Sequence, residues 1–512
     1  MSGAIYRGRD QTADQTIDCD VCIIGSGAGG AVLAAGLAEA GKSVVILEAG
    51  SWLTRRDFTL NEADAFSMLY QERGGRSTED RAITVLQGKS VGGSTTVNWT
   101  TCFRTPARIL SHWAEHHGID FTSEQLAPHF SAVEERLNIH RWDPAIANAN
   151  NRKLLEGCEA LGLEATPLRR NVKGCVNSGY CGMGCPVNGK QAMHLTYLPD
   201  AVNAGARLYA NTQAERLVVE NDRVAEVRCS IRDETTGRDT GVRLIVRPKI
   251  AVSSAGAING PALMLRSGLN HSGRVGQRTF LHPVVGIPST YAEPVNPFYG
   301  APQSIGSHEY IDRGPDRFGF FIESAPLHPA LAAISQPSIG KAARAFMANL
   351  SHAGILLALQ VDGLLPGDEG GTVRVKKDGR PVLAYPVSKA LIEGFAASHE
   401  VIARISLAAG AEVVSTLHNE PIYMRTEADL ALLKSAPYGP FEHSIFSAHQ
   451  MGGCAMGPDP STSVVGPDFR YHHLDNLFVV DGSVFPTSLG VNPSQSIYGL
   501  AHYARGSVLG AL

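Results

Sequence analysis

The order of apolar and polar segments near the N-terminus predicts a βαβ unit. Asp20 to Ile24 is a short, β-branched apolar run, which is typical of a buried parallel strand. A glycine turn follows, then a helix of small residues over Ala31 to Ala40 that stops at Gly41, and a second strand over Ser43 to Leu47. Strand, helix and strand together span about 30 residues, the size expected for such a unit.

The rest of the chain contains both the apolar spacing of helices and the alternating pattern of strands. Ile109 to Leu137 has the apolar spacing of one helix with a polar face. Strands are expected over Arg207 to Val219, Val224 to Ile231, Leu244 to Ser253 and Leu477 to Asp481, and a hairpin over Gly371 to Pro386 with its turn at Asp378-Gly379. One further helix is expected to end at Leu265, and two others to cover Leu391 to Ala409 and Ser494 to Val508. This mixture indicates an α/β or α+β protein.

Length and composition narrow the class of protein. A chain of 512 residues is too long for one core and indicates two or three domains. The formal charge is −4, which gives no indication of nucleic-acid binding or of an anionic membrane as partner. The chain shows neither a secretory signal pattern nor an apolar run long enough to span a bilayer, so we expect a cytoplasmic protein. The 54 glycines are more than usual, and many lie in motifs where backbone would approach a ligand.

The glycine turn predicts a dinucleotide site. Gly25-x-Gly27-x-x-Gly30 follows a strand and opens a helix, so the helix N-terminus would face a pyrophosphate with free N–H groups. Glu48 ends the second strand, 18 residues after Gly30, where an acid can bind ribose hydroxyls. The spacing alone does not decide between FAD and NAD.

Four ordered segments resemble the glucose–methanol–choline (GMC) flavoprotein oxidoreductases. Besides the glycine turn, Gly88 to Asn98 resembles their first signature, Ser254 to Gly268 their second, and the last 70 residues their C-terminal motifs. The resemblance implies a Rossmann-like FAD-binding domain with a substrate domain built on an antiparallel sheet flanked by helices. It implies FAD, held without a covalent bond because Thr95-Thr96-Val97 contains no histidine. The residues expected at the cofactor are Gly25, Gly27, Ala28, Gly30, Glu48, Val91, Gly93, Ser94, Asn98, Ala214, Ala255, Gly256, Asp481, Gly482, Asn492 and Pro493.

The same resemblance implies a catalytic pair. His449 opens an H-x-x-G-[TSG]-C-x-M-G run, in which the family places its base. Asn492 precedes Pro493 at the family's second position, where an amide can hold the substrate oxygen. Hydride removal from an alcohol carbon also requires loss of the hydroxyl proton, and a histidine of near-neutral pKa can accept it.

Three cysteines leave alternatives open. Cys175, Cys181 and Cys185 could form a structural loop, an iron–sulfur cluster as in some sugar dehydrogenases of the family, or another metal site with His194. We favour the structural loop and expect no metal. The flanking residues, Cys181 to Pro186 and Thr196 to Pro199, resemble the long-chain (fatty) alcohol oxidase branch and its bacterial relatives.

The expected function is oxidation of an alcohol by hydride transfer to FAD, with oxygen or a quinone or other carrier as acceptor. Three other functions stay open: a non-redox lyase on the GMC fold, a sugar dehydrogenase that passes electrons through an iron–sulfur cluster, and a flavin-bearing electron carrier or binding module without catalysis. The expected domains are an FAD-binding domain over 15–110, 195–300 and 440–512, a helical and Cys-rich insertion over 111–194, and a substrate-binding domain over 301–439.

Overall fold

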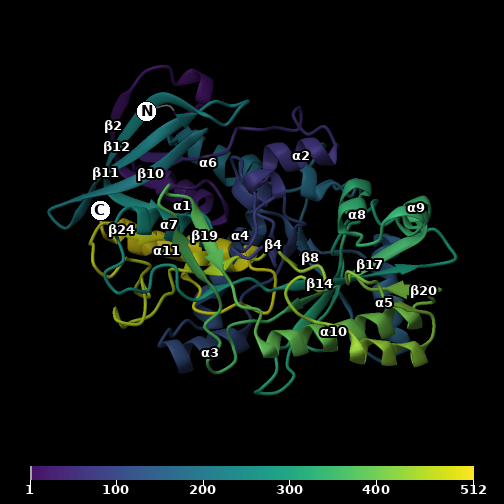
Figure 1. Cartoon of the computed structure of the whole chain (residues 1–512). Helices are drawn as coiled ribbons and strands as arrows, with labels where there is room; N and C mark the ends of the chain where they lie inside the picture. Colours follow the sequence, from purple (N-terminus) through teal and green to yellow (C-terminus); the bar gives the residue numbers. More distant parts are fainter. Residues whose placement is uncertain (1–2) are drawn as a thin grey trace.

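The computed structural model describes residues 3–512, and two sheets organise it (Figure 1). The first sheet has the strand order β1-β9-β3-β2-β12-β11-β10, with β24 added beside β12. Its strands are β1 (Ala4–Tyr6), β2 (Gln15–Ile24), β3 (Val44–Leu47), β9 (Arg207–Tyr209), β10 (Thr212–Glu220), β11 (Arg223–Arg232), β12 (Asp239–Ser253) and β24 (Leu477–Val479). Strands from β1 to β12 and β24 pair in parallel, whereas β12, β11 and β10 form an antiparallel meander.

The first half of the molecule is the part built on the first sheet, and its helices pack on the parallel strands. α1 (Ala28–Glu39) lies against α6 (Tyr197–Asn203) and α11 (Ser494–Gly510), and α11 contacts α4 (Ser123–Arg136). α1 is apolar on nearly every side, and Ala31 to Ala38 are all buried, because it is enclosed between the sheet and these helices. α7 (Gly256–Arg266) follows β12 directly.

The second sheet is antiparallel apart from one short edge pair, and has the order β21-β20-β14-β17-β16-β15-β7. Its strands are β7 (Thr166–Pro167), β14 (Val284–Thr290), β15 (Ile305–Ser307), β16 (Phe320–Ser324), β17 (Ala353–Gln360), β20 (Val413–Ser415) and β21 (Tyr423–Met424), with β22 (Phe446–Ser447) on β14 and β4 (Thr84–Val85) on β22. α5 (Ala149–Ala160) and α10 (Lys389–Ala408) contact its central strands. The predicted fold class, Rossmann-like domain plus antiparallel sheet, is confirmed.

Both faces of the second sheet are buried, and the two-residue period of its strands assigns each side chain to one face. Leu356 and Ala358 belong to the core shared with α5 and α10. Leu357 and Leu359 belong to a second apolar cluster on the opposite face. α8 (Pro329–Ser335) and α9 (Gly340–Ala348) pack on that second cluster at the outer edge of this half (Figure 1).

Two sequence predictions about elements are wrong. Ile109 to Leu137 is two helices, α3 (Ala107–His117) and α4, because Gly118 ends α3 in the left-handed conformation (φ 67°) and Thr122 caps α4. The predicted strand Arg207 to Val219 is split into β9 and β10 at Asn211, which has φ 54°. The other predicted helices and strands are present, with ends shifted by a few residues except for β2 and β12, which begin five residues earlier than predicted.

The remaining paired strands are short. β5 (Thr101–Cys102), β6 (Ile139–Arg141) and β8 (Arg169–Asn171) form a three-stranded sheet, β13 (Thr279–Phe280) pairs with β23 (Met451–Gly452), and β18 (Thr372–Val375) with β19 (Pro381–Ala384). α2 (Glu62–Leu69) precedes β4. No helix of residues 3–512 is long and apolar enough to cross a membrane.

The second half of the molecule, built on the second sheet, contains a buried histidine cluster that makes its stability sensitive to acid. The rings of His399, His418 and His443 lie 5.2–5.5 Å apart, and both nitrogens of His418 lack a hydrogen-bond partner. Burial, together with the neighbouring histidines, lowers the pKa of His399 to about 3 and that of His443 to about 4. The ordinary value is about 6.5, so the unfolded chain binds protons here that the native state does not.

We therefore expect the free energy of unfolding to fall as the pH drops from about 6.5 towards 4, by about 3 kcal/mol for His443 alone. Urea unfolding at pH 7 and pH 5 measures the first part of this loss, about 2 kcal/mol for His443. His443→Gln should reduce the difference between the two pH values, whereas substitution of the exposed His140 should leave it unchanged. Equal pH dependence in wild type and His443→Gln would contradict the assignment.

Candidate active site

The glycine turn between β2 and α1 forms one wall of a cavity. Gly25 has φ 107° and donates its N–H to the Leu47 carbonyl, 2.8 Å away, which fixes the turn to β3. A Cβ on Gly30 would overlap the Gly25 carbonyl oxygen, so this glycine lets α1 pack on the turn. A Cβ on Gly27 would meet only Gly93 Cα, 3.8 Å away. No side chain caps α1, so its first N–H groups face the cavity beside Gly27.

A second glycine loop lies against the first. Gly93 has φ 55°, and a Cβ there would meet Gly27 Cα at 2.8 Å. Ser26 joins the two loops, because its Oγ accepts the Gly92 N–H (3.0 Å) and donates to Glu48 Oε2 (2.6 Å). The other oxygen of Glu48 accepts the Gly50 N–H at 2.7 Å. Glu48 therefore organises the turn, and burial raises the pKa of its carboxyl group.

Asp481 ties the C-terminal part of the chain to the same wall. Its Oδ2 accepts the Gly256 N–H at the start of α7 (2.7 Å), and its Oδ1 accepts the Ser483 N–H (2.8 Å). Gly256 has φ 82°, which favours glycine at this junction. Burial raises the pKa of Asp481. The side chain thus holds the second glycine-rich turn beside Gly482.

The cavity has a volume of about 540 Å³ and is shared by both halves of the molecule. Of the residues predicted at the cofactor, those that line it are Gly25, Gly27, Ala28, Glu48, Gly93, Ser94, Asn98, Ala214, Ala255, Gly256, Asp481, Gly482, Asn492 and Pro493. Gly30 and Val91 do not line it: Gly30 packs on the turn, and Val91 is buried with its N–H bonded to the Ser51 carbonyl.

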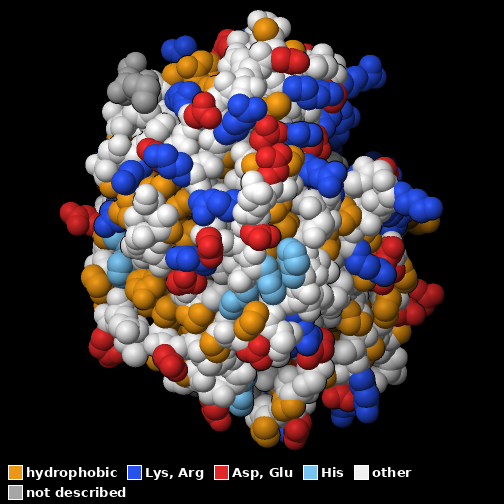
Figure 2. Space-filling view, turned by 90° about the vertical axis from the view of Figure 1, so that its left-hand side faces the viewer, with side chains coloured by type: hydrophobic (Ala, Val, Ile, Leu, Met, Phe, Trp, Pro, Cys, Tyr) orange, Lys and Arg blue, Asp and Glu red, His pale blue; other side chains and the backbone are white. Residues whose placement is uncertain are grey.

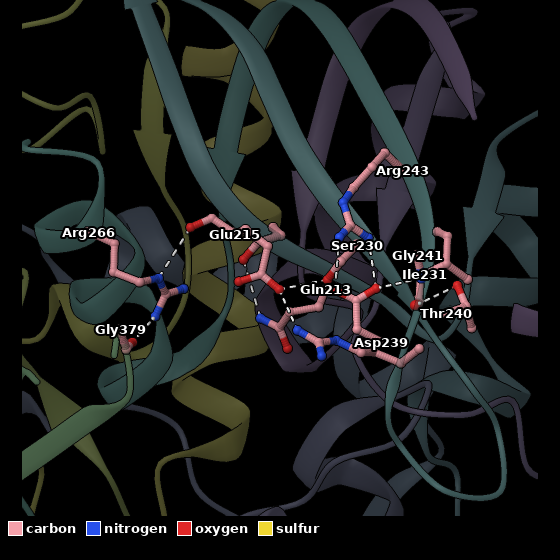
Figure 3. Close-up of polar contacts among 12 residues, drawn as sticks. Gln213, Glu215, Ser230, Ile231, Asp239, Thr240, Gly241, Arg243, Arg266 and Gly379 are labelled. Atoms are coloured by element: carbon pink, nitrogen blue, oxygen red, sulfur yellow. Dashed lines mark hydrogen bonds and ion pairs between the residues drawn. The ribbon is translucent and has the colours of Figure 1, made fainter. Parts of the chain in front are cut away.

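The tip of the β18–β19 hairpin borders the cavity at Asp378 to Pro381. Arg266, at the end of α7, donates to the carbonyls of Glu215 (3.2 Å) and Gly379 (3.1 Å) and so links the hairpin to β10 (Figure 3). The Glu215 carboxylate in turn accepts from Ser230 Oγ at 2.6 Å (Figure 3). Arg266 and the buried Arg76 are two cations of the cavity wall that no sequence motif marked.

His449 and Asn492 meet at the cavity although 43 residues separate them in the sequence. Their Nε2 and Nδ2 atoms are 3.4 Å apart, and both residues line the cavity. Burial lowers the pKa of His449 to about 4, so its ring is neutral at physiological pH. Asn492 also donates to Glu323 Oε2 (3.3 Å), while its Oδ1 has no partner in the protein.

Two further buried side chains hold this pair, and the sequence analysis did not find them. Glu323, on β16, accepts from Asn492 and from Gln303 Nε2 (2.5 Å), and burial raises its pKa to about 8. His282 places its Nδ1 3.2 Å from Nδ1 of His449. His282 is held from behind by Asp362, whose Oδ1 accepts its backbone N–H (3.1 Å).

The hydrogen-bond partners of His282 and His449 determine which ring nitrogen of each carries the proton. The Gly490 N–H donates to Nε2 of His282 (3.1 Å), so that nitrogen holds a lone pair. Burial, together with His449 and Arg108, holds the pKa of His282 well below its usual value. The neutral ring therefore carries its proton on Nδ1 and donates to Nδ1 of His449. Neutral His449 then carries its own proton on Nε2. In this arrangement the 3.4 Å contact with Nδ2 of Asn492 is not a hydrogen bond, and the amide donates to Glu323.

The three cysteines lie in a loop next to this site. Cys175, Cys181 and Cys185 are partly exposed free thiols. Lys190 is buried and donates to the carbonyls of Thr96, Asn98 (3.1 Å) and Cys181 (2.7 Å), which ties this loop to the second glycine loop. Throughout residues 3–512, no group of three or more His, Cys, Asp or Glu side chains could hold a metal ion.

These features fit a dinucleotide. Two glycine turns leave room for a pyrophosphate beside a free helix N-terminus. Asn98, in the second loop, lines the cavity, and its Oδ1 is buried without a partner in the protein. The residues that would hold the dinucleotide are those of the glycine turns, Glu48 and the segment around Asp481.

Family models and known proteins agree with this geometry. Two models described as GMC oxidoreductase match residues 66–284 and 368–501, and one described as FAD binding domain matches residues 18–57. A long-chain-alcohol oxidase of Arabidopsis thaliana is 31% identical, over 97% of this chain and 68% of its own length. A GMC-type oxidoreductase of Mycobacterium tuberculosis is also 31% identical, over 94% of this chain and 74% of its own.

Solved structures show the same fold. Pyridoxine 4-oxidase from Mesorbium loti superposes with a TM-score of 0.70 at 21% identity, covering 95% of this chain and 98% of its own. A formate oxidase gives a TM-score of 0.70 at 15% identity, covering 97% and 99%.

Proposed function

This chain belongs to the GMC oxidoreductase family, and on that premise we propose that it oxidises an apolar alcohol to the aldehyde or ketone, with FAD as cofactor. FAD, when bound, accepts the hydride from the alcohol carbon. The observation that carries the proposal is the meeting of His449 and Asn492 on the wall of the cavity that the glycine turns also line.

In this proposal His449 takes the hydroxyl proton and Asn492 holds the hydroxyl oxygen. A neutral imidazole is ready to accept a proton, and the pKa of His449 keeps it neutral. Nδ2 of Asn492 carries two hydrogens. One is donated to Glu323, and the other can donate to the substrate oxygen. The amide positions the oxygen without competing for the proton.

His282 acts as a positioning residue for this step. In the resting pair Nε2 of His449 carries a proton, so it becomes a base only when both rings exchange tautomers. In this exchange one proton moves from Nδ1 of His282 to Nδ1 of His449. Nε2 of His449 releases a proton to solvent, Nε2 of His282 takes one up, and the Gly490 N–H loses its acceptor. We propose that the substrate hydroxyl selects this second arrangement by donating to the bare Nε2 of His449.

The wall opposite the glycine turns supports an apolar substrate. Val284, Leu357, Leu359, Trp99 and Phe446 line the cavity and belong to the apolar cluster on that face of the second sheet or pack on it. Such a wall offers an aliphatic chain favourable burial and a sugar no hydrogen bonds. We therefore propose a long-chain or other apolar alcohol, and oxygen as acceptor by similarity to relatives named as oxidases.

The experiment that tests the function is anaerobic titration of the FAD-loaded protein with 1-butanol, 1-dodecanol and glucose. We expect 1-dodecanol to abolish the visible band of oxidised flavin at the lowest concentration and glucose to leave it intact. Readmitted air should restore the band within the turnover time if oxygen is the acceptor, and only an added quinone should restore it otherwise. A spectrum that no alcohol changes would favour a lyase on the same fold.

A further inference from the structure

We propose that α8 and α9, with the link between them (residues 329–348, here the α8–α9 segment), dock on an anionic lipid surface. The segment lies at the outer edge of the second half, away from the first sheet (Figure 1). The docking itself does not depend on the proposed alcohol oxidation. Delivery of a membrane-dissolved alcohol to the cavity, a consequence of docking, does rest on it.

The segment contains the most exposed large apolar side chains of the described residues. Ile339 is 89% exposed and Ile334 is 76% exposed, the two highest values among the large apolar residues of the part of the chain that the structure describes. Five alanines of the segment are exposed beside them: Ala330, Ala333, Ala342, Ala345 and Ala348. Contiguous exposed apolar surface of this kind is characteristic of an interaction site.

The charged residues of the α8–α9 segment indicate which kind of partner it binds. Lys341 and Arg344 are exposed on α9, and the sequence from Ser324 to Val361 contains neither aspartate nor glutamate. Glu62, on α2, does contact the segment, but its two oxygens accept the N–H groups of Ala330 (2.6 Å) and Leu331 (2.8 Å) at the start of α8. On the face of the first half in Figure 2, by contrast, acidic and basic side chains are interspersed.

Apolar residues next to cations, without acids, fit the boundary between lipid headgroups and acyl chains. The isoleucines would enter the acyl region while the cations remain at the phosphates. Each Lys or Arg near an anionic surface is expected to raise affinity about fivefold. A second copy docked through the same face would place cations against cations, because the segment contains no aspartate or glutamate.

The inner side of the segment connects to the cavity. Phe346 and Met347 pack on the same apolar cluster as Val284, Leu357 and Leu359, and those last three also line the cavity. Continuous apolar packing therefore joins the docking surface to the proposed substrate wall.

The test is sedimentation of the full chain with vesicles of phosphatidylcholine alone or of phosphatidylcholine and phosphatidylglycerol at about 3:1. We expect binding to the anionic vesicles that weakens with salt. Ile334→Ser with Ile339→Ser should lower the partition coefficient at least about tenfold. Lys341→Gln with Arg344→Gln should lower it by about 25-fold on anionic vesicles.

Two control pairs match these changes elsewhere on the surface. Tyr423→Ser with Phe441→Ser removes exposed apolar area, and Arg216→Gln with Arg223→Gln removes two exposed cations. Both should bind as wild type. Wild type that stays in solution with both vesicles, or isoleucine variants that bind like wild type, would overturn the proposal. So would a dimer that the isoleucine variant converts to monomer in sedimentation velocity, because the face would then join two copies.

The readout is independent of catalysis. Binding needs no alcohol, so failure of the flavin titration would leave this result intact, and failure of vesicle binding would leave alcohol oxidation intact. Each variant should retain the wild-type thermal unfolding midpoint, since the substituted side chains are exposed.

Discussion

Replacement of His449 by glutamine is expected to lower kcat for alcohol oxidation by about 10²–10⁴-fold while FAD stays bound. The reason is local: the neutral imidazole is the proposed acceptor for the hydroxyl proton, and a glutamine amide cannot take it at any physiological pH. Glutamine retains a polar group near Asn492, so the cavity keeps much of its shape. The measurement is the rate of flavin bleaching in single turnover, with the flavin content of each preparation as reference.

His116→Gln, on the exposed surface of α3, is the matched control and should bleach at the wild-type rate. A His449→Gln variant that bleaches within threefold of wild type would remove this histidine from the proton transfer. Loss of FAD in the variant would instead mean that His449 supports the cofactor site.

A second variant, His282→Asn, tests whether His282 sets the position of the proton on His449 or only packs against its ring. Its amide oxygen can accept permanently from Nδ1 of His449, which leaves Nε2 bare and stabilises the imidazolium. Because a charged His449 cannot act as base, the acid limb of the pH profile of kcat/KM should move to higher pH, by a unit or more. An unchanged profile with lower amplitude would mean that His282 only packs against the ring.

Prediction from the sequence was most accurate for elements whose signals lie close together in the chain. The βαβ unit was predictable because a buried strand, a glycine turn and a helix stop each leave a signal within a few residues of one another. The helix over Ile109 to Leu137 was wrong because apolar spacing continued across Gly118, and the left-handed end there outweighs the spacing.

The site shows the same limit. His449 and Asn492 lie in segments with recognisable spacing, and the structure brings their side chains to 3.4 Å. Their supports, His282 and Glu323, lie just before β14 and within β16, where most of the surrounding residues are apolar. Only the pairing of the second sheet and its position beside the cavity bring those two groups to the pair, and such pairing leaves no trace in a single sequence.

The second large effect is expected at the glycine turn, where two glycines should fail in different ways. Gly27→Ala places a methyl group in space that the protein leaves open, with Gly93 Cα 3.8 Å away. The apoprotein should therefore fold with unchanged stability, while FAD affinity should fall at least about 100-fold, because backbone can no longer approach the pyrophosphate. Flavin fluorescence titration of the apoprotein measures the affinity, and urea unfolding measures the stability.

Gly30→Ala should instead prevent the native packing of α1, because its methyl group would overlap the Gly25 carbonyl oxygen and press on Ile23 Cγ2, 3.1 Å away. Backbone cannot rotate away there without breaking the bond from Gly25 to Leu47. Gly506→Ala supplies the control for general glycine effects, since Gly506 lies within α11, has no left-handed φ, and would have nothing within 4 Å of an added Cβ. If Gly27→Ala and Gly30→Ala lost stability equally, the first glycine would serve packing rather than the cofactor. Retention of full FAD affinity by Gly27→Ala would place the pyrophosphate elsewhere in the cavity.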